Sequence, residues 1–102
     1  MTERSASLDL DLITRIAARV DVPLVLHGSS GIPDAQLVLA VAAGIRKVNV
    51  GTALNVAWTG AVRAALADQP DAVDPRRYFS AGRDDMAAVV AHLCAVIARG
   101  EA

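Results

Sequence analysis

Apolar residues recur at helical spacing in four separate stretches of the chain. In the first stretch an apolar residue occupies every fourth position, namely Leu8, Leu12, Ile16 and Val20. Ser7 or Asp9 can cap the free amides at the start of this helix. The predicted helices cover residues 8–20, 33–43, 53–67 and 80–100. Pro33 suits a first helical turn, Ser80 can cap the last helix, and Gly44 and Gly100 are stop signals.

Two short apolar runs between these helices predict β-strands. Residues 24–27 lie between Pro23 and a Gly-Ser-Ser-Gly sequence, and residues 47–50 precede a Gly-Thr pair. Two strands joined through a helix must be parallel, and parallel strands need cover on both faces. The chain is therefore predicted to be an α/β protein with too few strands for a separate fold, so that it combines strands from several copies or is the end of a larger fold.

Composition and charge exclude several classes of protein. The 102 residues hold 10 Lys plus Arg against 11 Asp plus Glu, and a net charge of -1 gives no basic field for a general nucleic-acid binder. One cysteine excludes an internal disulfide. The beginning of the chain has no signal-peptide core, and no run reaches the length of a membrane span. We therefore expect a cytoplasmic protein without a membrane partner, with residues 1–7 forming a disordered end.

The chemistry is expected where the two strands end. In α/β folds, ligands gather between strand ends and helix starts, which here are His-Gly-Ser-Ser-Gly at 27–31 and Asn-Val-Gly-Thr at 49–52. Small residues let backbone amides approach a ligand, and each following helix adds its positive end, so the two loops can cradle a phosphate. The alternative is that Gly and Ser only form tight turns.

Strand alternation brings one polar residue from each loop to the same face. If the leucines and valines face the helices, His27 and Asn49 point together into the interior. Buried polar groups need partners, and a ligand or a metal would satisfy both. The alternative is a histidine whose partner is a neighbouring carbonyl group.

These motifs resemble the C-terminal part of class II, zinc-dependent ketose-bisphosphate aldolases. The resemblance covers nearly the whole chain after Ala6, including the turn at 74–76 and the final helix. The family's usual loop is His-Gly-Gly-Ser-Gly, and Ser29 replaces its second glycine. The stretches that carry the resemblance are residues 8–12, 22–33 and 44–52.

The resemblance implies that residues 8–102 form the C-terminal quarter of a (β/α)8 TIM barrel, with strands 7 and 8 and their helices. His27 would be one of three zinc-ligating histidines. The expected ligands of the phosphate and hydroxyl groups of dihydroxyacetone phosphate are Gly28, Ser30, Asn49, Gly51 and Thr52. The complete enzyme would cleave a ketose phosphate, such as fructose 1,6-bisphosphate or tagatose 1,6-bisphosphate, to dihydroxyacetone phosphate and an aldehyde.

The resemblance also implies what this chain lacks. In the family, the other two histidine ligands, the acid/base carboxylate and six strands lie upstream. We therefore expect the chain alone to be inactive, and to act in a homo-oligomeric full-length protein or with an upstream barrel fragment. Two alternatives stay open: a non-catalytic phosphate-binding or interaction module, and a degenerate remnant.

The remaining polar residues receive structural interpretations. His92 is predicted to be a solvated surface residue, and Cys94 to belong to the apolar core stripe of the last helix. Five aspartates at helix starts suit capping or dipole roles: Asp9, Asp11, Asp34, Asp84 and Asp85. Arg76 and Arg83 could meet a second phosphate, but surface ion pairing explains them equally well, so no role is assigned to either.

Overall fold

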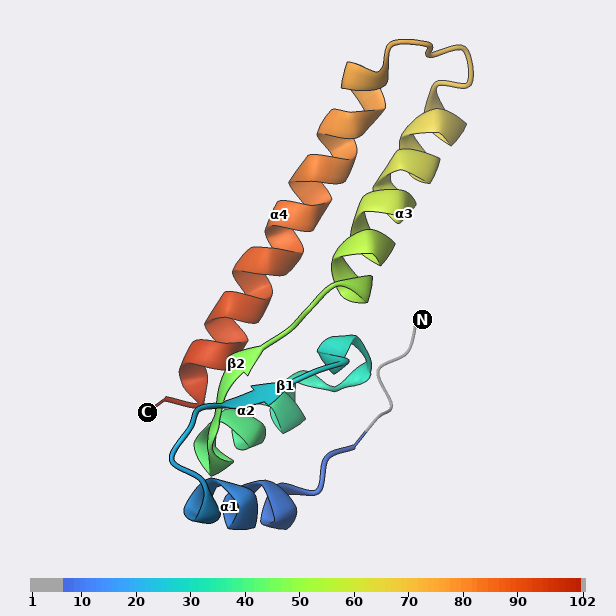
Figure 1. Cartoon of the computed structure of the whole chain (residues 1–102). Coiled ribbons are helices and arrows are strands. Elements are labelled where there is room, and N and C mark those ends of the chain that lie inside the picture. Colours follow the sequence, from blue (N-terminus) through green and yellow to red (C-terminus); the bar gives the residue numbers. More distant parts are fainter. Residues whose placement is uncertain (1–6, 102) are drawn as a thin grey trace.

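A computed structural model describes residues 7–101 of the chain (Figure 1). The elements in order are α1 (Leu10–Arg19), β1 (Leu24–Leu26), a short 3-10 turn (Ser29–Gly31), α2 (Asp34–Ala43), β2 (Ile45–Val48), α3 (Thr52–Asp68) and α4 (Pro75–Arg99). This is the predicted α/β order with a two-stranded sheet. Within the described residues, no helix combines the length and apolarity needed to cross a membrane.

The two strands are parallel, as predicted, but the second begins earlier than the sequence suggested. β2 covers Ile45–Val48 and not residues 47–50. Gly44 ends α2 with a φ of 138°, which turns the chain directly into the strand, and Ile45 is buried. The register pairs Leu26 with Val48, after a shift beside Leu24. The strands therefore end level with each other.

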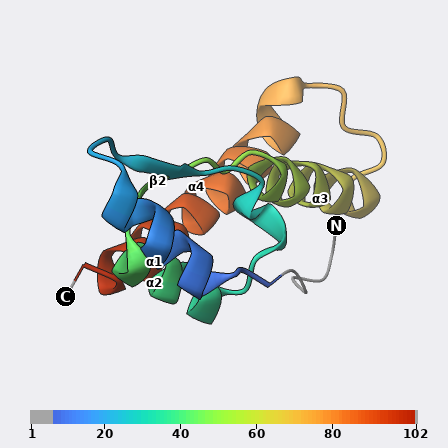
Figure 2. The ribbon, with the colours of Figure 1, turned by 60° about the horizontal axis from the view of Figure 1, so that its bottom comes forward.

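The helix α1 begins as the capping pattern indicated. The side chain of Asp9 accepts a hydrogen bond from the Leu12 amide at 3.0 Å, so Asp9 and not Ser7 is the cap. Asp11, in the first turn, forms an ion pair with Arg15 at 3.1 Å. α1 lies beside α2, which in turn lies beside the sheet, as Figures 1 and 2 show.

The last helix is longer than predicted. α4 begins at Pro75, so residues 75–79 are helical and Ser80 lies inside the helix instead of capping it. The physical reason is that Asp74 is the cap: its carboxylate accepts a hydrogen bond from the Arg76 amide at 3.0 Å, and Pro75 suits the first helical position. α3 and α4 therefore form a long antiparallel hairpin, which projects from the α/β body in Figure 1.

The core lies where α2, the sheet and the end of α4 meet. Its buried residues are Ile32, Leu37, Leu93 and Val96. Cys94 is exposed, so its predicted place in the core is wrong. Val90, one helical turn before Cys94, is also 42% exposed, because α4 is covered on one side and this part of its apolar stripe faces outward.

Candidate functional site

His27 and Asn49 meet at the ends of the paired strands. Each follows the last residue of its strand, and those last residues, Leu26 and Val48, are register partners. The Asn49 amide donates to the Leu26 carbonyl at 2.9 Å, and Asn49 Nδ2 lies 3.1 Å from His27 Nδ1. The predicted contact between the two side chains is confirmed, but the predicted interior position is not, because His27 is exposed in this chain. The partner at this ring nitrogen is a side-chain amide and not a carbonyl group.

This contact matches one of the two tautomers of the imidazole ring. The Asn49 Nδ2 group is a donor, so the facing Nδ1 atom of His27 is the acceptor. A neutral imidazole carries one proton, which then lies on Nε2. His27 is exposed and Asn49 is half-buried, so a ligand can reach both side chains.

Gly28 supplies the backbone conformation that turns the chain away from the strand. Its φ and ψ angles are 63° and 33°, in the left-handed region that residues with a Cβ atom avoid. The 3-10 turn begins at the next residue. The His-Gly pair therefore places the imidazole at the strand end and directs the following serines toward α3.

Two serine hydroxyl groups then tie the first loop to the second. Ser29, which is 2% exposed, donates its hydroxyl to the main-chain oxygen of Asn49 at 2.6 Å. The Ser30 oxygen accepts a hydrogen bond from the Ala53 amide at 3.0 Å, at the start of α3. Because the Ser30 oxygen is an acceptor here, its proton can be donated to an anion. Sequence analysis predicts a ligand role for Ser30, but it does not predict this second role in joining the loops.

The two loops enclose a hollow of about 550 Å³ between them. We call it the strand-end hollow. It is lined by Gly28, Ser30, Gly31, Asn49, Val50, Gly51 and Thr52. All five residues predicted to hold a phosphate are among them. The structure thus brings the complete predicted set together from two loops of one chain.

The start of α3 gives the strand-end hollow a positive character. α3 has 17 residues, begins at Thr52 after Gly51, and has no acidic side chain in its first turn. The Ala53 amide already donates to Ser30, and the amides of Leu54 and Asn55 donate to the Gly51 carbonyl group, so it is chiefly the helix dipole that favours an anion at this end. Thr52 adds a hydroxyl group at the rim, which can donate to the same anion. The arrangement suits a phosphate group.

An apolar cavity of about 380 Å³, which the sequence did not predict, adjoins the hollow between α3 and α4. His92 lies on its wall, and Nε2 of this ring is 2.5 Å from Oδ2 of Asp34 in the first turn of α2. His92 is exposed, as predicted, and is also paired with Asp34. Since 58 positions separate the two residues, no local sequence pattern predicts the contact.

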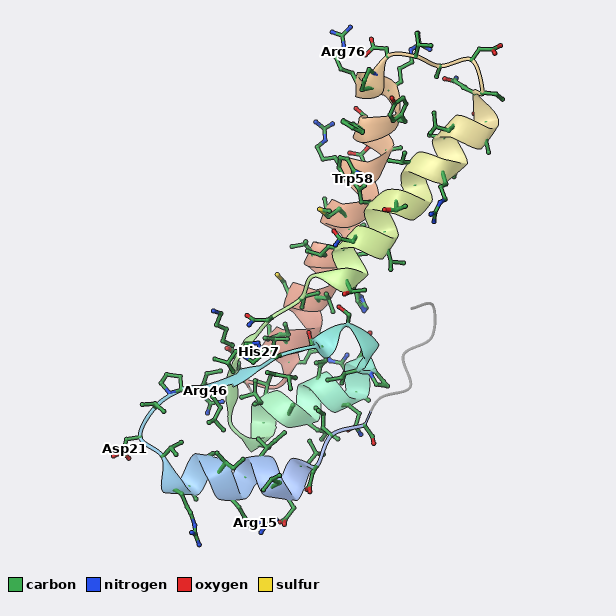
Figure 3. All side chains as sticks on the ribbon, turned by 45° about the vertical axis from the view of Figure 1, so that its right-hand side comes forward. Arg15, Asp21, His27, Arg46, Trp58 and Arg76 are labelled. Atoms are coloured by element: carbon green, nitrogen blue, oxygen red, sulfur yellow. The ribbon has the colours of Figure 1, made fainter. Side chains whose placement is uncertain are left out.

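Arg76 and Arg83, the two arginines considered for a second phosphate, do not line the strand-end hollow. Arg76 is at the tip of the α3–α4 hairpin, far from His27 (Figure 3). Its guanidinium contacts Asp74 at 2.7 Å, and hydrogen bonds from Arg76 lower the pKa of that carboxyl group. Arg83 pairs with Asp84 at 3.8 Å on the surface. Surface ion pairing therefore accounts for both arginines within this chain.

The described part of the chain does not form a metal site by itself. Across residues 7–101, no cluster of three or more His, Cys, Asp or Glu side chains could hold a metal ion. A catalytic zinc takes three protein ligands and one open position. His27 provides one imidazole, so it can serve only as one ligand of a site that other residues complete.

The chain matches one protein family over almost its whole length. The sequence model of the family described as fructose-bisphosphate aldolase class-II matches residues 1–101.

Proposed function

We propose, from the fact that this chain belongs to the class II fructose-bisphosphate aldolase family, that it supplies the phosphate-binding end of an aldolase active site. The family supports a lyase role in carbohydrate metabolism and a phosphorylated ketose as the kind of substrate. Within that role, we assign to the chain strands 7 and 8 of a (β/α)8 barrel, represented by β1 and β2. The observation that carries the proposal is the strand-end hollow.

The strand-end hollow supports phosphate binding by its chemistry. Its small residues leave main-chain amides accessible, Ser30 and Thr52 bring hydroxyl groups, and the N-terminus of α3 adds a positive end. A phosphate group of the ketose, retained in dihydroxyacetone phosphate after cleavage, fits these donors. The carboxamide of Asn49 lies between the hollow and His27, where it can contact the substrate hydroxyl groups beside that phosphate.

His27 is our candidate for a zinc ligand, in a site completed by two upstream histidines. When bound, the zinc supplies a Lewis acid that polarises the substrate ketone. In the observed arrangement, Nδ1 accepts from Asn49 and Nε2 carries the proton. Rotation of the Asn49 carboxamide, which presents Oδ1 to a protonated Nδ1, frees the Nε2 lone pair for a metal. Asn49 would then orient the ligand, as partners of metal-bound histidines commonly do.

The group that transfers the proton would belong to another part of the complete protein. The chain alone offers one imidazole at the site, and the acid/base carboxylate is expected upstream. We therefore propose that the isolated chain has no aldolase turnover. The complete assembly, by this proposal a cytoplasmic homo-oligomer or a complex with an upstream barrel fragment, cleaves fructose 1,6-bisphosphate, tagatose 1,6-bisphosphate or a related ketose phosphate.

One observation favours a second candidate function, a non-catalytic phosphate-binding module. The strand-end hollow is built entirely from this chain, whereas the metal site is not. Such a module would bind phosphate with or without an upstream partner. A degenerate remnant, by contrast, would bind neither phosphate nor metal.

Calorimetric titration with inorganic phosphate and with dihydroxyacetone phosphate tests the proposal. We expect the 102-residue chain to bind both with one-to-one stoichiometry. Zinc content, measured on the chain coexpressed with an upstream barrel fragment, should fall in the His27→Ala variant and stay unchanged in His92→Ala, the matched control. If the chain does not bind phosphate, the proposed role of the strand-end hollow is wrong. If the zinc content of His27→Ala is unchanged, His27 is not a zinc ligand.

A further inference from the structure

The hydroxyl group of Ser29 is unusual in this chain because it is polar and buried. Ser29 is the one buried polar side chain among the residues that the structure describes, with 2% of its surface exposed. Its hydroxyl donates across the two loops to the main-chain oxygen of Asn49 at 2.6 Å, a contact between residues 20 positions apart. A buried hydroxyl needs such a partner, and this one belongs to the neighbouring loop.

Asn49 is thereby held on three sides. Its amide donates to Leu26 of β1, its carbonyl group accepts from Ser29, and its Nδ2 group donates to His27. The first two contacts fix the main chain on either side of the Asn49 Cα atom. They leave the carboxamide directed at the imidazole, so the placement of that carboxamide depends on the Ser29 hydroxyl.

We propose that Ser29 is a positioning residue for this site: its hydroxyl holds Asn49 against His27 and thereby keeps the strand-end hollow in shape. The inference rests on the proposed function and adds to it a residue that itself contacts neither phosphate nor metal. A glycine at position 29 would have no hydroxyl group and could not form the bond. The tie between the loops is therefore a property of this chain's Ser-Ser sequence.

Because Ser29 acts on His27 through Asn49, the loss of its hydroxyl group should change the tautomer of His27, which NMR spectroscopy can detect. With Asn49 Nδ2 at Nδ1, the neutral His27 ring carries its proton on Nε2. Without the Ser29 tie, the carboxamide is released and both tautomers become populated. His92, the other histidine of the chain, binds Asp34 through Nε2 and does not contact Ser29, so it is an internal control.

The experiment compares the wild-type chain with Ser29→Ala, Ser29→Gly and Ser80→Ala, labelled with 15N at histidine. Ser80 is exposed on α4 and is the matched control. In Ser29→Ala and Ser29→Gly we expect the His27 nitrogen shifts to move toward a tautomer average while His92 stays unchanged. We also expect the Asn49 amide to exchange about fivefold faster, as the loss of one hydrogen bond of roughly 1 kcal/mol implies.

Three results would overturn the inference. One is that His27 shifts and Asn49 exchange match the wild type in both Ser29 variants. Another is that His92 shifts as much as His27, which marks a general loss of structure. The last is that Ser80→Ala reproduces the change. These readouts need no phosphate or metal, so wild-type failure to bind phosphate would count against the proposed function alone.

Discussion

The carboxamide of Asn49 lies 3.1 Å from the imidazole of His27, although 22 positions separate the two residues in the sequence. The contact exists because β1 and β2 are parallel and end in register, at Leu26 and Val48. The two loops of the site therefore begin at the same edge of the sheet. One loop carries the imidazole and the turn after it, and the other leads to the start of α3.

Thr52 provides a direct test of phosphate binding. Its hydroxyl lies at the rim of the strand-end hollow, at the first residue of α3. Thr52→Val keeps the shape and removes the donor, so affinity for inorganic phosphate should fall about tenfold, since a hydrogen bond to a charged group contributes roughly 1.5 kcal/mol. Calorimetric titration measures this, with Thr59→Val, an exposed threonine of α3, as the control. Equal loss in both variants would remove Thr52 from the site.

We predict that any side chain at position 28 lowers the stability of the folded chain. A Cβ atom there would meet no atom within 4 Å, so the penalty of Gly28→Ala comes from the left-handed backbone and not from a clash. We expect the free energy of unfolding to fall by about 1 kcal/mol and phosphate affinity to fall with it. Gly60→Ala, in an open part of α3, should instead be stabilising by up to about 1 kcal/mol. Denaturant unfolding compares them, and a stabilised Gly28→Ala would contradict the assigned conformation.

Gly82 lets α4 approach the indole ring of Trp58. A Cβ atom at Gly82 would lie 2.7 Å from Trp58 Cδ2, and that ring packs against Phe79 with centroids 5.4 Å apart. Gly82→Ala should therefore displace the indole ring and lower the free energy of unfolding by about 1 kcal/mol, despite the better helix propensity of alanine. Trp58 fluorescence should shift toward that of an exposed indole. Equal free energies of unfolding for Gly82→Ala and Gly60→Ala would contradict the close approach of Gly82 to Trp58.

Asp74 should make the start of α4 sensitive to acid. Hydrogen bonds from Arg76 lower the pKa of this carboxyl group below its ordinary value of 3.8. A carboxyl group with a depressed pKa in the folded state stabilises that state above the unfolded pKa, and loses the effect as pH falls through the folded value. Amides at the start of α4 should therefore exchange faster below about pH 4, relative to intrinsic rates. In Asp74→Asn this acid-dependent change should vanish, and its persistence would contradict the assignment.

The sequence predicted element order more reliably than element boundaries. The pattern at residues 47–50 predicts a strand, but Gly44, with its positive φ, ends α2 so abruptly that the strand begins at Ile45 and ends at Val48. The pair Asp74 and Pro75 is typical of a turn, but the same pair also caps a helix, and here it begins α4.

The site residues were predictable in part, because strand alternation and small-residue loops are local patterns. The five residues assigned to phosphate binding do line one hollow. The Ser29 bond to Asn49 and the pairing of His92 with Asp34 were not predictable, since each joins distant parts of the chain. Cys94 shows a different limit: helical periodicity identifies a stripe, but not how much of that stripe other elements cover.

The role of the chain in an aldolase active site can be tested by the rate of dihydroxyacetone phosphate release from fructose 1,6-bisphosphate, measured in a coupled assay. The chain would be assayed alone and after coexpression with an upstream barrel fragment of a class II aldolase that carries the missing ligands. We predict no turnover by the lone chain, turnover by the zinc-loaded complex, and loss of that turnover in the His27→Ala complex but not in the His92→Ala complex. Turnover by the lone chain, or an equally active His27→Ala complex, would contradict this prediction.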